Sequence, residues 1–223
     1  LYKAMHRTLP TNDISFPFPY NPPPAGMNIP KKQCRIYWDV LTQTKLPANK
    51  NELAFYSIPQ LASLIMNKKI SSVELTKFFI ARLKKWDDTL ECVITLTEEL
   101  AMKQAKKADD ELKAGIYRGP LHGIPYGLKD LFAVKGYKTT WGTTPYMDQV
   151  LDVDSYVYTE LKNHGAVLCA KLSLGALAYN NKWFGGETKN PWNLSQGSSG
   201  SSAGSAAAVT AGLLPFAIGT ETL

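Results

Sequence analysis

The stretch "GSSGSSAGSAAAVTAGLLPFAIGTET" runs from Gly197 to Thr222 and decides how the chain is interpreted. Its first eight residues, Gly197–Gly204, contain only glycine, serine and one alanine, a composition typical of a flexible linker. An alanine-rich helical segment and an apolar strand follow with almost no gap. A glycine loop that enters a helix N-terminus presents backbone N–H groups, which favour anions or developing negative charge. These flanks favour a functional loop over a linker.

Upstream of this stretch, helical patterns alternate with short apolar runs. The first two helices carry start signals: a Ser57 cap with Pro59, and a capping box from Ser71 to Glu74. Helices are predicted over 57–69, 71–86, 97–115 (closed by Gly115), 155–165 (closed by Gly165) and 205–214, and strands over 92–96, 125–132, 166–171 and 215–221. The β-branched run 92–96 is expected to be buried. This order predicts an α/β fold, a mixed β-sheet core flanked by helices.

The chain is predicted to have two parts. Residues 1–50 hold eight of the fourteen prolines, including "FPFPYNPPPAG", and predict an extended proline-rich arm. The aromatic residues of the arm suggest that it lies on a folded body. Residues 51–223 form the folded domain.

Composition argues against several classes of function. The formal charge is +6, but the lysines are dispersed in pairs on helix-like stretches such as "LKKW" and "QAKK", so we expect solvated faces and no nucleic-acid partner. Three cysteines and three histidines are scattered without metal-ligand spacing, so no metal is expected. No apolar run is long enough to span a membrane. A cytoplasmic location is the default, with export if a leader preceded Leu1.

Four segments together resemble the amidase signature family of serine hydrolases. They are "GPLHGIPYGLKDLFAVKG" (119–136), "GAVLCAKLSLGALA" (165–178), "TKNPWN" (188–193) and the opening stretch, in the order of the family. The resemblance covers roughly Phe55 to Leu223. It implies the amidase signature fold, incomplete in this chain, and hydrolysis of a small-molecule or peptide amide through an acyl-enzyme without a cofactor. A homodimer is compatible with it.

The resemblance also implies a Ser–cisSer–Lys triad. Lys129, in "GLKD", takes the lysine position, although a lysine at a strand end is otherwise most simply a snorkelling surface residue. "GSS" occurs twice, so the bridging serine is Ser198 or Ser201. The family's spacing to the serine before the alanines, Ser205, selects Ser201, and its peptide bond with Gly200 is then expected to be cis.

The same pattern places the nucleophilic serine two positions past Leu223. We therefore expect the chain as given to be inactive alone. The resemblance assigns the oxyanion and substrate-binding positions to Thr222, Leu223 and Ser202. Two rivals stay open: the glutaminase-type subunit of a tRNA-dependent amidotransferase, against which the long arm argues, and a truncated, inactive binding domain.

Two residues near Lys129 are given structural roles. His122 lies in the tight-turn context "GPLHGIP", and the family's triad contains no histidine. Asp130 follows Lys129 directly and is expected to fix local geometry rather than to titrate.

Overall fold

A computed structural model describes residues 43–221. Of the predicted arm, residues 1–42 lie outside the described residues, as do Thr222 and Leu223. The division into 1–50 and 51–223 therefore stays a prediction.

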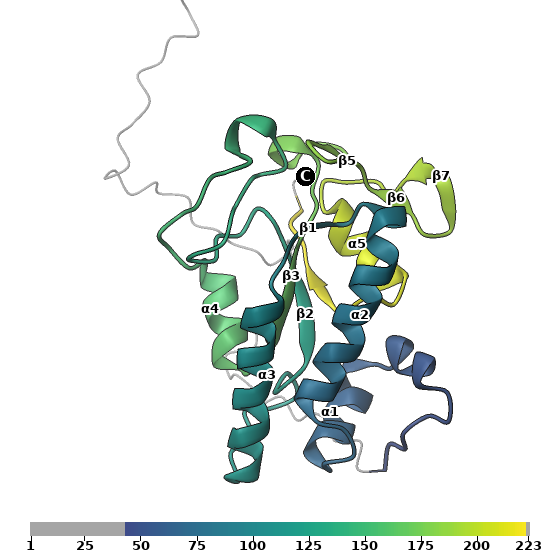
Figure 1. Cartoon of the computed structure of the whole chain (residues 1–223), viewed down its shortest axis with the longest axis vertical. Coiled ribbons are helices and arrows are strands. Elements are labelled where there is room, and N and C mark those ends of the chain that lie inside the picture. The colour runs from purple at the N-terminus through teal and green to yellow at the C-terminus, as the bar shows by residue number, and fades with distance from the viewer. Residues whose placement is uncertain (1–42, 222–223) are drawn as a thin grey trace, which may run out of the picture. The chain divides into compact units, whose positions relative to one another are not determined.

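The first two helices begin where the sequence signals place them (Figure 1). Ser57 precedes the first, with Pro59 in its first turn, and Ser71 with Glu74 forms a capping box at the second. Gly115 and Gly165 follow their helices with positive φ, as helix-ending glycines do. The helices are α1 (Ile58–Met66), α2 (Ser72–Leu90), α3 (Glu98–Lys113), α4 (Tyr156–Asn163) and α5 (Ala203–Thr210), with short 3₁₀ helices at Lys50–Phe55, Thr144–Tyr146 and Ala176–Ala178.

Four strands form the main sheet, in the order β1-β3-β2-β8. Strand β3 runs antiparallel to β1 and parallel to β2, and β2 runs parallel to β8, so the predicted mixed sheet is confirmed. The strands are β1 (Val93–Leu96), β2 (Pro125–Lys129), β3 (Val167–Leu172) and β8 (Ala217–Ile218). Two small hairpins, β4 (Lys182–Trp183) with β5 (Gly186–Glu187) and β6 (Lys189–Asn190) with β7 (Asn193–Gly197), lie at one end of the sheet (Figure 1).

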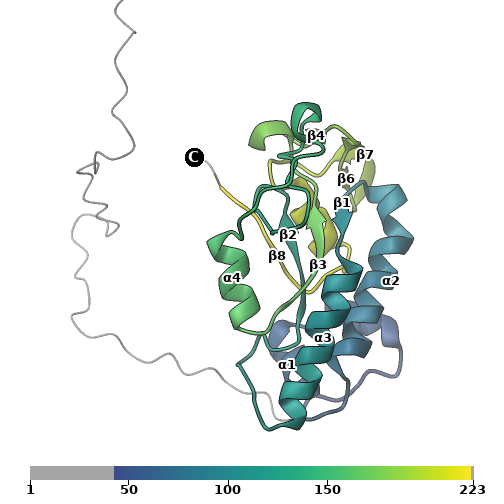
Figure 2. The ribbon, with the colours of Figure 1, turned by 60° about the vertical axis from the view of Figure 1, so that its left-hand side comes forward.

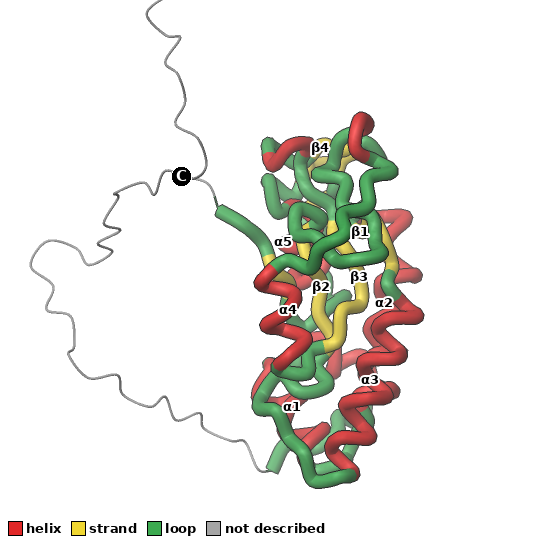
Figure 3. The backbone as a smooth tube through the Cα atoms, turned by 90° about the vertical axis from the view of Figure 1, so that its left-hand side faces the viewer, coloured by secondary structure: helices red, strands yellow, loops and turns green. Residues whose placement is uncertain are grey.

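Two apolar clusters cover the two faces of this sheet. One joins α1, α2 and α5 to β3, and the other joins Tyr158 of α4 to Tyr126 and Leu128 of β2. Figure 2 shows α4 and α2 on opposite sides of the sheet, and Figure 3 shows the same layers from another side. Side chains that alternate along β2 therefore enter two different environments.

Three details differ from the sequence expectations. Of the run 92–96, Cys92 is buried but strand β1 is only partly buried, because it lies at the edge of the sheet next to β3. Helix α5 begins at Ala203, two residues before Ser205, and β8 is only two residues long. The helical lysines at 84–85 and 106–107 are exposed, as expected. Within residues 43–221, no helix combines the length and apolar character that crossing a bilayer requires.

Candidate active site

Three segments converge at the carboxyl edge of the sheet. Lys129 is the last residue of β2, and Thr220 follows the neighbouring parallel strand β8. Ser201 and Ser202 lie in the loop that leads into α5, whose first residue is Ala203. The carboxyl ends of parallel strands face the same side of a sheet, which is where α/β folds commonly place ligand sites.

The side chain of Lys129 is fully buried and is surrounded by hydroxyl groups. Its Nζ donates hydrogen bonds to Ser201 Oγ at 2.7 Å, Ser202 Oγ at 3.1 Å and Thr220 Oγ1 at 2.6 Å. An ammonium group has three protons to donate, whereas a neutral amine has two and a lone pair that accepts. In the neutral form, one of these hydroxyls can therefore donate its proton toward Nζ. The alternative of a snorkelling surface lysine is wrong.

Burial is the main influence on the charge of Lys129. It lowers the pKa of the amine, and the negative charge of Glu221 opposes that effect without cancelling it. Removing an ammonium group from water disfavours its charged form, so the neutral amine is more accessible here than on an exposed lysine.

The loop that carries Ser201 is held by backbone contacts. The Gly200–Ser201 peptide bond is cis, which confirms the sequence expectation, and the Ser201 carbonyl accepts from Gly175 N at 3.1 Å. A Cβ atom on Gly200 would overlap the backbone carbonyl of Asn180, so only glycine fits there. Ser198, the other candidate for the bridging serine, donates from Oγ to Ala203 O at 3.1 Å rather than contacting Lys129. The stretch is a built loop, not a linker.

Ser202 belongs to the same cluster. Besides accepting from Lys129, its Oγ accepts from Thr220 N and donates to Thr220 O, both at 3.0 Å. Thr222 and Leu223, the other positions assigned to oxyanion or substrate binding, lie outside the described residues. That assignment stays a prediction for all three.

His122 lies away from this cluster, at the amino end of β2. Its ring is buried, with Nε2 2.9 Å from Ala108 O, and Arg118 N donates to Nδ1 at 3.4 Å. These backbone contacts agree with the structural role expected for it. Over residues 43–221, no group of His, Cys, Asp and Glu side chains is arranged to hold a metal ion.

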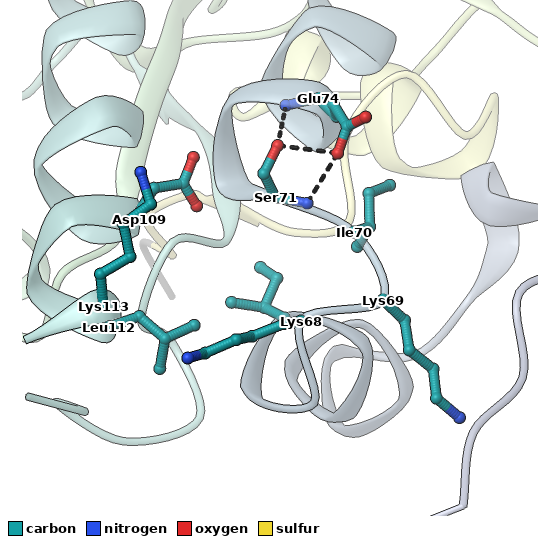
Figure 4. Close-up of a pocket in the computed structure, with 9 residues that line it drawn as sticks. Lys68, Lys69, Ile70, Ser71, Glu74, Asp109, Leu112 and Lys113 are labelled. Carbon is teal, nitrogen blue, oxygen red and sulfur yellow. Dashed lines mark hydrogen bonds between the residues drawn. The ribbon is translucent and has the colours of Figure 1, made fainter. Parts of the chain in front are cut away.

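A separate pocket of about 230 Å³ lies at the turn between α1 and α2 and is lined by Lys68, Glu74 and Asp109 among others (Figure 4). Ser72, at the start of α2, donates from Oγ to Gly123 O just before β2, so this pocket is at the opposite end of the sheet from Lys129. Asp109 accepts from the N–H groups of Ser72 and Val73 and thus caps α2. The pocket takes no part in the hydroxyl cluster.

Sequence reasoning missed two features of the site. Thr220 belongs to a recognisable motif, but no signal in a single sequence says that its side chain turns back to Lys129. The buried ion pair between Asp130 and Lys171 was also missed, because Asp130 was considered without a partner. The signal available in the sequence was a lysine at or near the end of each of two strands, Lys129 in β2 and Lys171 in β3.

A buried lysine is hydrogen-bonded here to a serine that follows a cis peptide bond. Both residues lie at the edge of a mixed sheet, the serine in a glycine-serine loop. This arrangement defines the class of protein, which is one with an amidase-type fold. The family model described as Amidase matches residues 74–222. The chain belongs to this family, the amidase signature family.

Known members share both sequence and structure with the chain. A glutamyl-tRNA(Gln) amidotransferase subunit from Marinomonas sp. is 44% identical over 170 residues, which cover 74% of this chain and 35% of the relative. The peptide amidase of Stenotrophomonas maltophilia superimposes with a TM-score of 0.67 at 34% identity, over 72% of this chain and 35% of that one. A fatty acid amide hydrolase gives a TM-score of 0.73 at 30% identity, over 78% and 31%. The chain thus spans about a third of the length of the relatives it matches.

Proposed function

We propose that this chain supplies the general base and the bridging serine of an amide hydrolase that cleaves linear carbon–nitrogen amide bonds. The observation that carries the proposal is the 2.7 Å hydrogen bond between the fully buried Lys129 Nζ and Ser201 Oγ. Within residues 43–221, the hydrogen bonds of the buried Lys129 Nζ go to hydroxyl groups, and such an amine is suited to act as a neutral base.

The proposed relay moves two protons. Lys129 Nζ accepts the proton of Ser201 Oγ, and Ser201 Oγ accepts the proton of a nucleophilic serine, which the family resemblance places beyond Leu223. The nucleophile attacks the amide carbonyl, the amine leaves with a proton returned through the relay, and water hydrolyses the acyl-enzyme. Backbone N–H groups near Thr222 and Leu223 would stabilise the oxyanion.

Substitutions at the relay test this proposal in the protein expressed from its complete reading frame. Lys129→Ala and Ser201→Ala should each lower kcat by about 10³-fold or more, and the double variant little further, because groups that act as one unit are not additive. Ser198→Ala is the matched control, since Ser198 bonds to Ala203 O and should leave kcat close to that of the parent. An equal loss of kcat in Ser198→Ala and Ser201→Ala would contradict the assignment of Ser201 as the bridging serine.

A second candidate function is glutamine hydrolysis within an amidotransferase complex. It is favoured by the 44% identity to a relative named as one component of such an enzyme. Ammonia release from free glutamine, compared with release from a panel of peptide and acyl amides, separates the two. Preference for glutamine that rises with a copurifying partner would support the amidotransferase role, and preference for the other amides would support a free-standing hydrolase.

No hydrolysis of any amide would favour the third possibility, a binding domain without activity.

A further inference from the structure

A buried ion pair lies on the opposite face of the sheet from Lys129. Asp130 follows Lys129, and its N–H donates to Leu172 O at 2.9 Å, which continues the pairing of β2 with β3. Because successive residues of a strand point to opposite faces, the side chain of Asp130 leaves from the face that Lys129 does not use. Lys171 pairs with Leu128 in the β2–β3 register and therefore shares that face. Its Nζ lies 2.5 Å from Asp130 Oδ1, and both side chains are fully buried.

Both charged side chains also make hydrogen bonds to residues 138–140. Lys171 Nζ also donates to Lys138 O at 2.8 Å and to Thr139 Oγ1 at 3.2 Å. Asp130 Oδ2 accepts from Thr140 N at 2.8 Å and from Thr140 Oγ1 at 2.5 Å. The pair thus attaches residues 138–140, which lie in a loop, to the ends of two central strands.

From Thr140, hydrogen bonds continue into the loops above the sheet. Thr140 Oγ1 accepts from Gly142 N at 3.1 Å, and the Gly142 carbonyl accepts from Phe184 N at 3.1 Å. The carbonyl of Trp141 accepts from Leu177 N at 2.8 Å. Residues 140–142 are therefore joined to Leu177 by a backbone hydrogen bond.

The segment 175–180 in turn contacts the Ser201 loop. Gly175 N donates to Ser201 O, and the backbone of Asn180 packs against Gly200. Leu177 and Asn180 have φ angles of 51° and 62°, the left-handed region that side chains rarely adopt, so surrounding contacts must hold this segment.

We infer that the Asp130–Lys171 pair is a positioning device for the candidate active site. It fixes the end of β2, which carries Lys129, and through residues 140–142 it fixes the segment that holds the Ser201 loop. The inference rests on the proposed function, since the positioned groups are those of the relay. Neither residue contacts the hydroxyl cluster, so both act through others.

A double variant separates positioning from simple stability. Asp130→Asn or Lys171→Met alone leaves one buried charge unpaired and should lower Tm by roughly 6–20 °C. Asp130→Asn with Lys171→Met removes both charges and should recover most of that Tm, since neutral replacement of a buried pair is often tolerated. Because misplacement by about 1 Å can cost about 10²-fold in rate, kcat of the double variant should stay about 100-fold below that of the parent, with KM little changed. Recovery of kcat together with Tm would overturn the inference.

Hydrogen exchange gives a readout that does not depend on turnover. In the double variant, peptides covering 138–143 and 174–184 should exchange faster than in the parent, while peptides from α2 should not change. Faster exchange in a protein that hydrolyses no amide would uphold the positioning role and reject the proposed function alone. Exchange identical to the parent would overturn the positioning role.

A further variant covers the case in which the double variant does not fold. Thr140→Val keeps the shape of residue 140 but removes the hydroxyl that joins Asp130 to Gly142 N. It should show the same faster exchange over 138–143 and a lower kcat. Parent-like exchange and kcat in Thr140→Val would overturn the inference as well.

Discussion

The hydroxyl of Ser202 lies 3.0 Å from both the amide nitrogen and the carbonyl oxygen of Thr220, accepting from one and donating to the other. These two hydrogen bonds join the start of α5 to the segment after β8. Because Lys129 Nζ also donates to the same hydroxyl, one side chain links three parts of the site.

Ser202→Ala should therefore destabilise the fold as well as the site. The change leaves the N–H of Thr220 without its acceptor and takes one of three acceptors from Lys129, which should lower the free energy of unfolding by about 1–3 kcal/mol. Urea unfolding measures it. Ser195→Ala is a suitable control, because Ser195 is exposed and its hydroxyl donates to Asn193 Oδ1, two residues earlier in β7. Equal unfolding midpoints for the two variants would contradict the expectation.

Much of the fold could be predicted because its signals are local. Ser71 and Glu74 form the predicted capping box, and Gly115 and Gly165 end their helices. The burial of the strand at 92–96 could not be predicted, because β-branched residues suit an edge strand as well as a central one. Whether a strand lies at an edge depends on partners distant in sequence.

For the site, sequence reasoning brought Lys129 and Ser201 together only through the family's motifs. Periodicity alone described Lys129 as a lysine at a strand end, and its burial depends on two segments distant in sequence, the loop of Ser201 and the segment after β8. The Asp130–Lys171 pair has a similar origin. The extra residue in β3 between the partners of Tyr126 and Gly127 sets which face Lys171 uses, and a one-residue irregularity of this kind leaves no pattern in the sequence.

Gly204→Ala should destabilise the protein, although glycine-to-alanine changes inside helices usually stabilise by about 0.5–1 kcal/mol. Gly204 lies in the first turn of α5, and an added Cβ would lie 2.5 Å from Cys92 O and from both the nitrogen and the Oγ of Ser173. Two of these neighbours are backbone atoms, so the helix start must shift, at a cost of about 1–3 kcal/mol. Urea unfolding of the single variant tests this expectation. Ser205, whose hydroxyl donates to Ile218 O, is retained in that variant. A more stable variant would show that α5 is packed less closely than described.

His122→Ala should lower stability and leave turnover per folded molecule unchanged. The substitution deprives Ala108 O and Arg118 N of their contacts with the buried ring, which should cost about 1–3 kcal/mol. Unfolding in urea measures the loss, and kcat measured well below the unfolding transition checks the site. Abolished turnover in a folded His122→Ala protein, with activity retained in Lys129→Ala, would transfer the role of base to the histidine.

The lowered pKa of Lys129 should make its contribution to stability depend on pH. At a pH below both its folded and unfolded values, the amine is protonated in both states, and its burial destabilises the fold. Between the lowered folded pKa and the ordinary value near 10.5, the unfolded chain holds a proton that the folded protein has released. Raising the pH through this window therefore stabilises the native state, by at most about 1.4 kcal/mol per pH unit.

The difference in unfolding free energy between the parent and Lys129→Met isolates this effect, since other titrating groups cancel. That difference should shift in favour of the parent as the pH rises from neutral toward 10. Lys103→Met is the contrasting control: Glu99 raises the pKa of this fully exposed lysine, so any dependence there has the opposite sign and is small. Urea unfolding at several pH values gives both series. A flat or falling difference for Lys129→Met would mean that the buried amine keeps its proton, and a permanently charged Lys129 could not accept one from Ser201.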